Sequence, residues 1–464
     1  MKFSSAIVAA AIGICATSIS AFTPSSISRG VTRSSSSVIT TQQSAPFLST
    51  QLNQYASAVS GAINLADEYA QRDVYSMEEF ATQYGMQKAP GVELYSDDGS
   101  DYQLITQQPI GAGQTVLYVP SDIVLSSDKA YQEFGGEIQQ AEQVLVQIDQ
   151  GTAARLPLFR LMVKILAEYD QGENSAFFPW LNSLPRVYYN GVSMTNDCFS
   201  CLPPYAGWLT STEKANYDSF VQALRGGYVQ LQSVNDDRVT QWAYNVALTR
   251  FQEVWSPQRA KLIAPMADML NHSAEPNCEI TFDDYGNCEV TAMYDIPAGM
   301  PLTISYGDPT NPTPIFAQYG FLPADCTTLF CKAMHLEPYI KELGIEFKDL
   351  LIQVESGEIA PKVWDLFLYE ILANNDPGAA EQYYVAMKTG DEGTRQQYQD
   401  QYFQYTLDSM KQHVYGILAD VDNLTAKAQS FDLSTHPRVP VIVAHNNLVR
   451  DTFTMTAALL EQMG

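Results

Sequence analysis

The sequence predicts an α+β fold, with a strand-rich part interrupted by helices and followed by a helical region. Short runs rich in β-branched residues, separated by turn residues, occur in 90–128 and again in 279–304. Between and after these stretches, apolar residues recur at the three- and four-residue spacing of amphipathic helices. At 464 residues the chain is long enough for two or three domains with a sizeable core.

The composition excludes some classes of partner. The chain has 26 Lys and Arg against 52 Asp and Glu, which gives a net charge of −26. Such an acidic surface repels phosphate backbones, so we expect no nucleic-acid binding. The same charge suits a basic protein substrate, although simple solubility explains it equally well. Past the N-terminal leader no apolar run reaches the length of a membrane span, so we expect no membrane insertion.

Residues 1–50 have the pattern of a two-part presequence. The apolar stretch Ala6–Ala16 follows a lysine and precedes small residues, as in a cleaved signal peptide. Residues 22–50 are rich in Ser and Thr, carry two arginines and contain no acidic residue, which is transit-peptide composition. This combination resembles the presequence of algae with secondary plastids and predicts a plastid location. Plain secretion is the alternative, and a fluorescent fusion of residues 1–60 appearing in the medium would favour it.

Several helices and strands can be placed along the rest of the chain. Residues 51–85 have helical spacing that ends at Gly85, and short strands are expected within 90–128. Residues 130–240 are largely helical, and a further helix over 241–253 leads to the next strands. After residue 321 the pattern is helical throughout. The expected C-terminal helices cover 361–375, 394–431 and 446–463.

The most informative stretch is 264–321. Its first half is an apolar run that ends in the polar residues Asp268, Asn271 and His272. Buried polar groups of this kind need partners, which can be the protein backbone or a bound polar ligand. Its second half holds a strand that ends in Tyr306-Gly307 and then a second Tyr-Gly pair. These pairs suggest tyrosine hydroxyls at the mouth of a pocket, where glycine lets the backbone approach closely.

The motifs of this stretch are similar to those of a known family. They are Asn271-His272-Ser273, Tyr306-Gly307, Asn311 and Tyr319-Gly320-Phe321. In this order and spacing they resemble the SET-domain methyltransferases, in particular the branch with the Rubisco large-subunit lysine methyltransferase and the actin-histidine methyltransferase. The resemblance implies a SET-domain β-fold with a knot-like core and a helical insertion, followed by an all-α C-terminal domain.

The resemblance also implies domain limits and a substrate class. A SET domain is expected over 75–325, and a helical substrate-binding domain over 326–464. Within the SET domain the N-terminal part would be 85–128, the helical insertion 129–240 and the core motifs 241–325. The substrate would be a protein, and Rubisco and aldolase are candidates by resemblance only.

Site residues follow from the resemblance position by position. Tyr306 matches the catalytic tyrosine. Asn271 and His272 match the pair that binds the amino and adenine ends of the methyl donor, S-adenosyl-L-methionine, and Asp268 begins that segment. Arg250 matches an arginine that contacts the donor carboxylate, although it could instead pair with an acidic side chain of the protein.

Two further positions complete the expected site. Tyr319 and Phe321 match the second aromatic position, which lines the adenosine or the target channel. Where the family has a G-x-G loop whose backbone approaches the donor, this chain has Asp101-Tyr102-Gln103, and Tyr102 would supply the backbone contacts.

The expected reaction is S-adenosylmethionine-dependent N-methylation of a protein lysine. An amine with an unperturbed pKa of about 10.4 must be deprotonated, desolvated and held near the methyl group. Two alternatives remain open: methylation of histidine, or a degenerate SET module that acts as a protein-binding scaffold because its G-x-G is missing.

The cysteines do not indicate a metal site. The chain has seven, including a C-x-x-C formed by Cys198 and Cys201, but no second C-x-x-C or Cys-His cluster. Histone-directed SET enzymes bind zinc through a cysteine after Asn-His-Ser and a cysteine-rich tail. Here that position is Ala274 and such a tail is missing, so no metal is expected.

Overall fold

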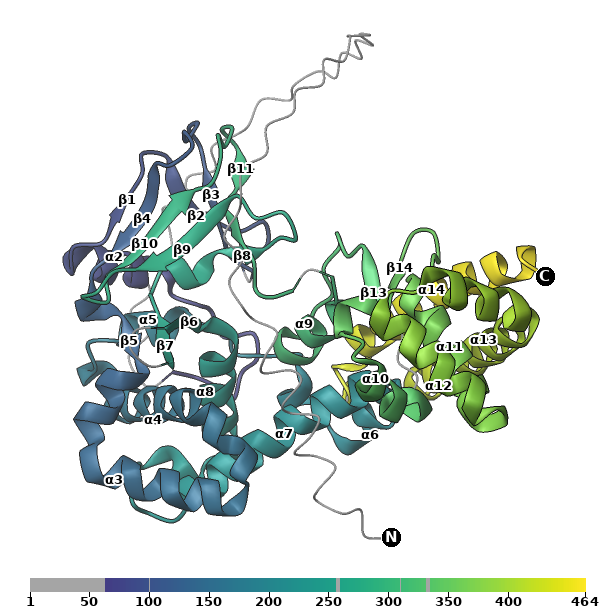
Figure 1. Ribbon diagram of the computed structural model, residues 1–464. Helices are drawn as coiled ribbons and strands as arrows, with labels where there is room; N and C mark the ends of the chain where they lie inside the picture. The colour runs from purple at the N-terminus through teal and green to yellow at the C-terminus, as the bar shows by residue number, and fades with distance from the viewer. Residues whose placement is uncertain (1–62, 100, 256–258, 309, 331–333) are drawn as a thin grey trace. The chain divides into compact units, whose positions relative to one another are not determined.

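A computed structural model describes residues 63–464 except 100, 256–258, 309 and 331–333 (Figure 1). The predicted presequence over 1–50 lies outside the described residues. Within the described ranges, no helix combines the length and apolarity that crossing a membrane requires. The predicted α+β class is confirmed by short sheets, built mainly from strands within 87–126 and 252–304, and by long helices between and after these ranges.

The first strand-rich layer is an antiparallel four-stranded sheet in which β4, β10 and β9 lie side by side (Figure 1). A turn at Asp283–Asn287 joins β9 to β10. Asp283 forms this turn, because its carboxylate accepts hydrogen bonds from the amides of Tyr285 and Asn287, both at 2.9 Å. In spatial order the strands are β1 (Gln87–Lys88), β4 (Thr115–Val119), β10 (Cys288–Ala292) and β9 (Cys278–Phe282).

Two three-stranded sheets complete the antiparallel structure. One is ordered β11 (Met300–Pro301), β3 (Gln103–Thr106) and β2 (Val92–Tyr95). The other is ordered β5 (Leu125–Ser126), β7 (Arg259–Ile263) and β6 (Gln252–Trp255). The strands predicted within 90–128 are therefore present, and β3 begins directly after Tyr102.

A short parallel pair joins the two halves of the 264–321 stretch. β8 (Asn271–His272) pairs with β12 (Thr303–Ile304), with Asn271 opposite Thr303 and His272 opposite Ile304. The amide of Ser273 extends the pairing by donating to the carbonyl of Ile304 at 3.0 Å. The Asn-His segment thus lies beside the strand leading to Tyr306.

The insertion between β5 and β6 is helical, as predicted. Its helices are α3 (Ser127–Ile148), α4 (Leu156–Gln171), α5 (Phe178–Ser183), α6 (Asn196–Phe199), α7 (Pro204–Leu224) and α8 (Asp237–Arg250). The last helix ends three residues earlier than expected, because the chain enters β6 at Gln252. Of the helix expected over 51–85, residues 51–62 lie outside the described residues, and the prediction is wrong for 63–73, which are not helical. The helical part is α2 (Val74–Gln83). Asp73 sets its start by accepting a hydrogen bond from the amide of Ser76 at 3.0 Å.

The C-terminal region is mainly helical, and α11 to α14 lie together in Figure 1. Its helices are α9 (Pro312–Tyr319), α10 (Glu337–Leu343), α11 (Pro361–Asn375), α12 (Pro377–Thr389), α13 (Glu392–Gln429) and α14 (Val439–Gln462). The predicted helices are all present, although α14 begins earlier than expected. The sequence analysis missed one antiparallel pair here, β13 (Thr328–Phe330) with β14 (Leu351–Gln353).

Three clusters of buried apolar side chains hold these elements. One is made by residues between 63 and 304, and a second by residues between 329 and 460. A smaller third cluster joins them, since it contains Cys198 and Cys201 of the insertion, Phe316 of α9 and Ile442 of α14. Both cysteines are thus buried thiols within an apolar cluster.

The two Tyr-Gly pairs differ in what they require of glycine. Gly320 has φ +82°, and a Cβ there would lie 2.5 Å from the carbonyl carbon of Tyr189. Gly307 has no positive φ, and a Cβ would meet no described heavy atom within 4 Å beyond its chain neighbours. The close backbone approach expected at both pairs therefore occurs only at Gly320.

This contrast gives a stability prediction. We expect Gly320→Ala to lower the free energy of unfolding by roughly 1–3 kcal/mol, because it adds both backbone strain and a clash with Tyr189. Gly307→Ala should change it by less than about 0.5 kcal/mol. Urea unfolding followed by circular dichroism measures both values, and equal losses for the two variants would contradict this interpretation.

Candidate active site

A cavity of about 220 Å³ lies beside the first predicted loop. It is lined by Asp97, Asp98, Asp101, Tyr102, Gln103 and Asn271. Tyr102 and Asn271, which are far apart in the sequence, therefore face one hollow, as predicted for two parts of a single site. The three carboxylates give this cavity an acidic lining, which favours a cationic ligand group.

The approach to Asn271 is strained. Met266 has φ +73°, the only positive φ of a non-glycine residue in the described part of the chain, and its side chain is fully buried. It precedes a short 3₁₀ turn, Ala267–Met269, that leads to β8. A residue other than glycine adopts this conformation only where its surroundings enforce it. The strain therefore marks the loop that sets the position of Asp268 and Asn271.

Arg250 and Asp268 form a buried ion pair. Nη1 of Arg250 lies 3.0 Å from Oδ2 of Asp268 and also donates to the Asp268 carbonyl oxygen at 2.9 Å. The Asp268 side chain is 1% exposed and accepts a further hydrogen bond from the indole of Trp180 at 3.0 Å. The structure thus shows the internal pairing that was the alternative for Arg250, and its contact with a donor carboxylate stays a prediction.

Tyr306 is held by the segment that contains Asn271 and His272. Its hydroxyl donates to the carbonyl oxygen of Leu270 at 2.6 Å, and its amide donates to Nδ1 of His272 at 3.1 Å. Burial raises the pKa of Tyr306 to about 12. The positive charge of Arg250 acts to lower this pKa, and the negative charge of Asp268 acts to raise it. The hydroxyl is therefore neutral at physiological pH.

The predicted aromatic residues gather around Tyr306. The ring of Tyr319 stacks on Tyr306 with 4.7 Å between centroids, and its hydroxyl donates to the Tyr306 carbonyl at 3.4 Å. Phe321 and His272 lie within 6.3 Å and 5.4 Å of the Tyr306 ring, centroid to centroid. All four residues assigned from the sequence thus form one cluster, which excludes water from one side of Tyr306.

His272 presents a defined tautomer. Because Nδ1 accepts the Tyr306 amide, the proton of the neutral ring lies on Nε2. Burial lowers the pKa of His272, which keeps the ring neutral. Nε2 is buried and has no hydrogen-bond partner among the described residues. The same holds for Nε of Arg250 and Oδ1 of Asp268, so the site contains several unsatisfied polar atoms that a ligand could bind.

Comparison with known proteins agrees with this geometry. Residues 101–307 match the family model described as the SET domain. This part of the chain is a SET domain. The matched range runs from the first predicted loop to Tyr306-Gly307, so it includes the helical insertion and both halves of the parallel pair.

Curated relatives contain the same domain. The human SET domain-containing protein 4 is 23% identical over 246 residues, which are 48% of this chain and 52% of that protein. The protein of the same name from Artemia parthenogenetica is 22% identical over 230 residues, 47% of this chain and 54% of the relative. The chain therefore spans about half the length of the curated relatives it matches.

Solved structures show a similar fold over more of the chain. Rubisco LSMT bound to AdoMet superposes with a TM-score of 0.53 at 12% identity, covering 84% of this chain and 92% of that chain. The SET domain of LSMT bound to lysine and AdoHcy gives 0.51 at 13% identity, over 84% and 91%. At this identity the likeness is one of fold, and it extends past the SET domain into the C-terminal helices.

Sequence reasoning missed one basic residue of the site. Arg72, before α2, donates to the carbonyl oxygen of Ser183 at 2.7 Å and lies over the ring of Tyr102, with 5.0 Å to its centroid. Burial and the neighbouring charge of Arg250 lower the pKa of Arg72 to about 10. Arg72 precedes the SET match, and its local sequence pattern only signals the start of a helix.

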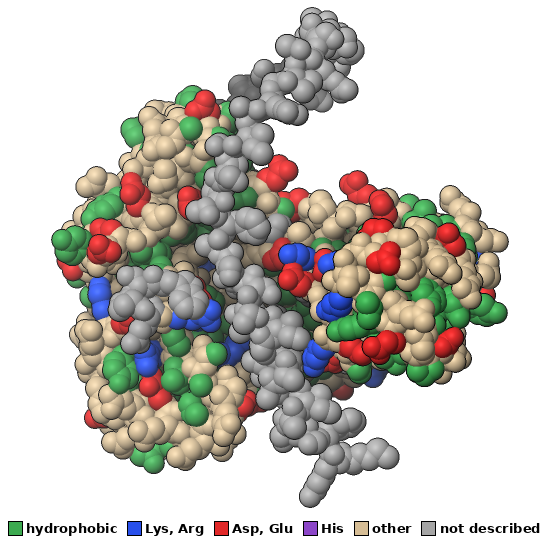
Figure 2. Space-filling view, in the orientation of Figure 1, with side chains coloured by type: hydrophobic (Ala, Val, Ile, Leu, Met, Phe, Trp, Pro, Cys, Tyr) green, Lys and Arg blue, Asp and Glu red, His purple; other side chains and the backbone are tan. Residues whose placement is uncertain are grey.

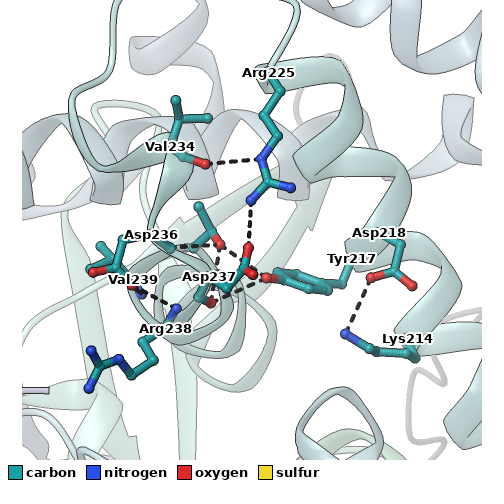
Figure 3. A network of polar contacts seen from close by, with 10 residues as sticks. Lys214, Tyr217, Asp218, Arg225, Val234, Asp236, Asp237, Arg238 and Val239 are labelled. Atoms are coloured by element: carbon teal, nitrogen blue, oxygen red, sulfur yellow. Dashed lines mark hydrogen bonds and ion pairs between the residues drawn. The ribbon is translucent and has the colours of Figure 1, made fainter. Parts of the chain in front are cut away.

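A larger hollow, of about 700 Å³, lies between α7 and α8 (Figure 3). Among its charged residues, Lys214 pairs with Asp218 and Arg225 with Asp237, and Arg238 adds a further positive charge. None of the motif residues lines it. Because no motif residue faces it, this hollow is a weaker candidate for the active site than the cavity beside Asn271.

The described part of the chain contains no assembled group of metal ligands. Among those residues, no three His, Cys, Asp or Glu side chains lie close enough together to hold a metal ion. Cys198 and Cys201 of the C-x-x-C are both buried free thiols.

The raised pKa of Tyr306 predicts a pH effect on stability. The folded state holds the phenol proton more tightly than the unfolded state, whose pKa is about 10. Tyr306 therefore adds stability below pH 10, and that stability is lost as the pH rises toward 12. We expect the stability difference between wild type and Tyr306→Phe to shrink by roughly 2–3 kcal/mol over this range.

Urea unfolding at pH 8, 10 and 11.5 measures this difference. Tyr405→Phe is the control, because the side chain of Tyr405 is 67% exposed. A difference for Tyr306→Phe that stays constant with pH would show that its hydroxyl is not buried as described.

Proposed function

We propose that this protein is an S-adenosylmethionine-dependent protein-lysine N-methyltransferase. The observation that carries the proposal is the assembly of the predicted motif residues in the SET domain, with several of their buried polar atoms unsatisfied. Native proteins seldom leave such atoms without partners unless a ligand satisfies them. The solved structures with a similar fold support the choice of ligand, since two of them are described as bound to AdoMet or AdoHcy.

The charges of the site fit the methyl donor, which carries a sulfonium, an ammonium and a carboxylate. The cavity beside Asn271 has a carboxylate-rich rim in Asp97, Asp98 and Asp101, which suits the positive groups. Arg72 and Arg250 are partly buried neighbours, since Nη2 of Arg72 and Nη1 of Arg250 lie 3.9 Å and 3.8 Å from Sδ of Met269. The charge of Arg250 also helps to lower the pKa of Arg72. Arginine binds carboxylates well, so this pair is the natural place for the donor carboxylate.

The bound donor supplies the methyl group, and the residues of the chain supply orientation and a dry site. Tyr306, Tyr319 and Phe321 form an aromatic wall that would hold the alkyl stem of a lysine and exclude water. The neutral hydroxyl of Tyr306 can orient the lone pair of the target amine without competing for its proton. Positioning of this kind supplies up to about 7–11 kcal/mol in favourable cases.

Lysine is preferred as the target because a structure of similar fold is described as bound to lysine together with AdoHcy. Histidine methylation is the alternative within the same chemistry. A binding scaffold is the alternative outside it, and it is favoured by one observation, the replacement of the G-x-G loop by Asp101-Tyr102-Gln103. A plastid protein is the proposed substrate, with Rubisco and aldolase as first candidates. The plastid location itself depends on residues 1–50.

Donor binding is the first test. We expect the full-length protein to bind S-adenosylmethionine in calorimetric titration, and Asn271→Ala to weaken binding by roughly tenfold or more, because it removes a polar group of the cavity. Asn271 is half-buried, so the melting temperature of the variant should stay close to that of the wild type. Gln397→Ala, at an exposed residue of α13 outside the cavity, is the control and should bind the donor like the wild type. Lack of binding by the wild type would reject the enzyme and favour the scaffold.

The modified residue is the second test. Plastid extract incubated with the protein and S-adenosylmethionine carrying a labelled methyl group should yield labelled lysine by mass spectrometry. Tyr306→Phe should still bind the donor but lower the transfer rate by about 10²–10⁴-fold, as expected when a positioned hydroxyl is lost. A labelled histidine in place of a labelled lysine would identify histidine as the target residue. Equal rates for Tyr306→Phe and wild type would remove Tyr306 from the catalytic role.

A further inference from the structure

Helix α9 connects the aromatic wall to the rest of the molecule. It ends at Tyr319, whose ring stacks on Tyr306, and the chain then turns at Gly320 to reach Phe321. Asn311 caps its first turn by accepting a hydrogen bond from the amide of Thr313 at 3.3 Å. A displacement of α9 would therefore move Tyr319 and Phe321 relative to Tyr306.

Hydrogen bonds to the SET domain hold one side of α9. The side-chain amide of Asn190 donates to the carbonyl oxygen of Gln318 at 2.8 Å, and the side chain of Gln318 donates to the carbonyl oxygen of Leu248 at 2.9 Å. Gly320 lies against the backbone of Tyr189. These contacts fix the C-terminal end of the helix, close to Tyr319.

On its other sides, α9 packs mainly on α7, and the side-chain amide of Asn311 donates to the hydroxyl of Tyr205 at 3.2 Å. Thr313 and Phe316 of α9 also contact α14 near the end of the chain. Nε2 of His445 lies 3.3 Å from the hydroxyl of Thr313, and its ring packs on Phe316 with 4.6 Å between centroids. Both rings are almost completely buried, at 2% and 0% exposure. Burial lowers the pKa of His445 to about 4, so the imidazole is a neutral hydrogen-bonding partner over the physiological range.

Helix α14 also contacts the segment that supports α9 from the SET side. Nε of Arg438, the residue before α14, donates to the carbonyl oxygen of Tyr188 at 3.1 Å. Its guanidinium lies over the ring of Tyr189, 5.4 Å from the centroid. Further along α14, the side chain of Asn446 donates to the carbonyl oxygen of Cys201 at 3.0 Å. One C-terminal helix thus braces both α9 and the SET-domain segment beneath it.

We propose that His445 is a positioning residue for the methyl-transfer site, acting through α9 to hold Tyr319 against Tyr306. The inference rests on the proposed function and extends it, because it makes the C-terminal region a structural part of the active site as well as a place where a substrate could dock. A buried histidine that only filled space could be replaced by a ring of similar size. A positioning histidine also needs its hydrogen bond to Thr313.

Three variants separate these roles. His445→Phe keeps a ring against Phe316 but loses the hydrogen bond, and His445→Ala loses both. Val449→Ala is the matched control, because Val449 is a buried residue one turn further along α14 that packs in the C-terminal core. Melting temperatures of the three variants establish that each one folds and how much stability it loses.

Hydrogen exchange measured by mass spectrometry tests the coupling without any enzymatic assay. If His445 positions the wall, His445→Ala should speed exchange in peptides covering α9 and also in those covering residues 302–307, which lie beyond Tyr319. Val449→Ala should leave both segments unchanged. Faster exchange confined to α9 and α14 would overturn the proposal. Because this measurement requires no donor, it remains decisive even if the proposed methyl transfer fails.

Kinetics of labelled methyl transfer provide the second measurement. We expect His445→Ala to lower kcat by roughly two- to thirtyfold, the range found for residues coupled to a site without touching it. The KM for S-adenosylmethionine should change little, since no residue of α9 lines the cavity beside Asn271. His445→Phe should fall between wild type and His445→Ala.

A double-mutant comparison identifies the route. In a Tyr319→Ala background, His445→Ala should have almost no further effect on kcat, because the ring that it positions is already missing. Multiplicative losses from the two substitutions would show that His445 acts independently of Tyr319 and would overturn the proposed route. An unchanged kcat for His445→Ala, with a lowered melting temperature, would reduce His445 to a packing residue.

Discussion

The site depends on the parallel pairing of β8 with β12. This pair is only two residues long on each side, yet it places Asn271 and His272 next to the strand that leads to Tyr306. The Tyr306 amide then bonds to His272, and its hydroxyl bonds to the carbonyl oxygen of Leu270. The β8–β12 pairing, the imidazole of His272 and the phenol of Tyr306 thus hold one another in place. Between β8 and β12 the chain forms the β9–β10 hairpin. Without the pairing, the predicted catalytic tyrosine would have no fixed relation to the predicted donor-binding residues.

Charge is arranged differently on the surface and in the site. The chain carries a net charge of −26, and Figure 2 shows acidic side chains spread over the visible face of the molecule. Beneath that surface, Arg72 and Arg250 both lie beside Sδ of Met269, and Arg250 forms an ion pair with the buried carboxylate of Asp268. Carboxylates line the adjoining cavity. Buried cations beside an acidic rim give a small region with separated charges, which is suited to a ligand that has both signs of charge.

The C-terminal helices contribute more than a separate module would. The expected boundary near residue 326 lies between the two large apolar clusters, one formed by residues up to 304 and one by residues from 329. The third cluster spans this boundary, because α9 and α14 pack together with the insertion. Its size is modest, but it lies next to the helix that carries Tyr319. Packing across the boundary is therefore coupled to the geometry of the aromatic wall.

Local sequence was sufficient for the elements whose signals are local. Periodic apolar spacing located α11 and α13, and turn residues separated the short strands within 279–304, because helices and tight turns are set by nearby residues. It could not show β13 and β14, which are three residues each, nor the strained backbone of Met266, since such features are stabilised by distant contacts.

The features of the site divide in the same way, into those that the local sequence indicates and those that depend on distant contacts. The order of Asn271-His272, Tyr306 and Tyr319-Gly320-Phe321 determined which residues belong together, through their resemblance to SET domains. Only the tertiary structure decided that Arg250 pairs with Asp268, that Arg72 lies over Tyr102, and that His445 contacts α9. These are contacts between residues far apart in the sequence, and their geometry depends on how separately formed elements pack. A single sequence records the residue types but not that packing.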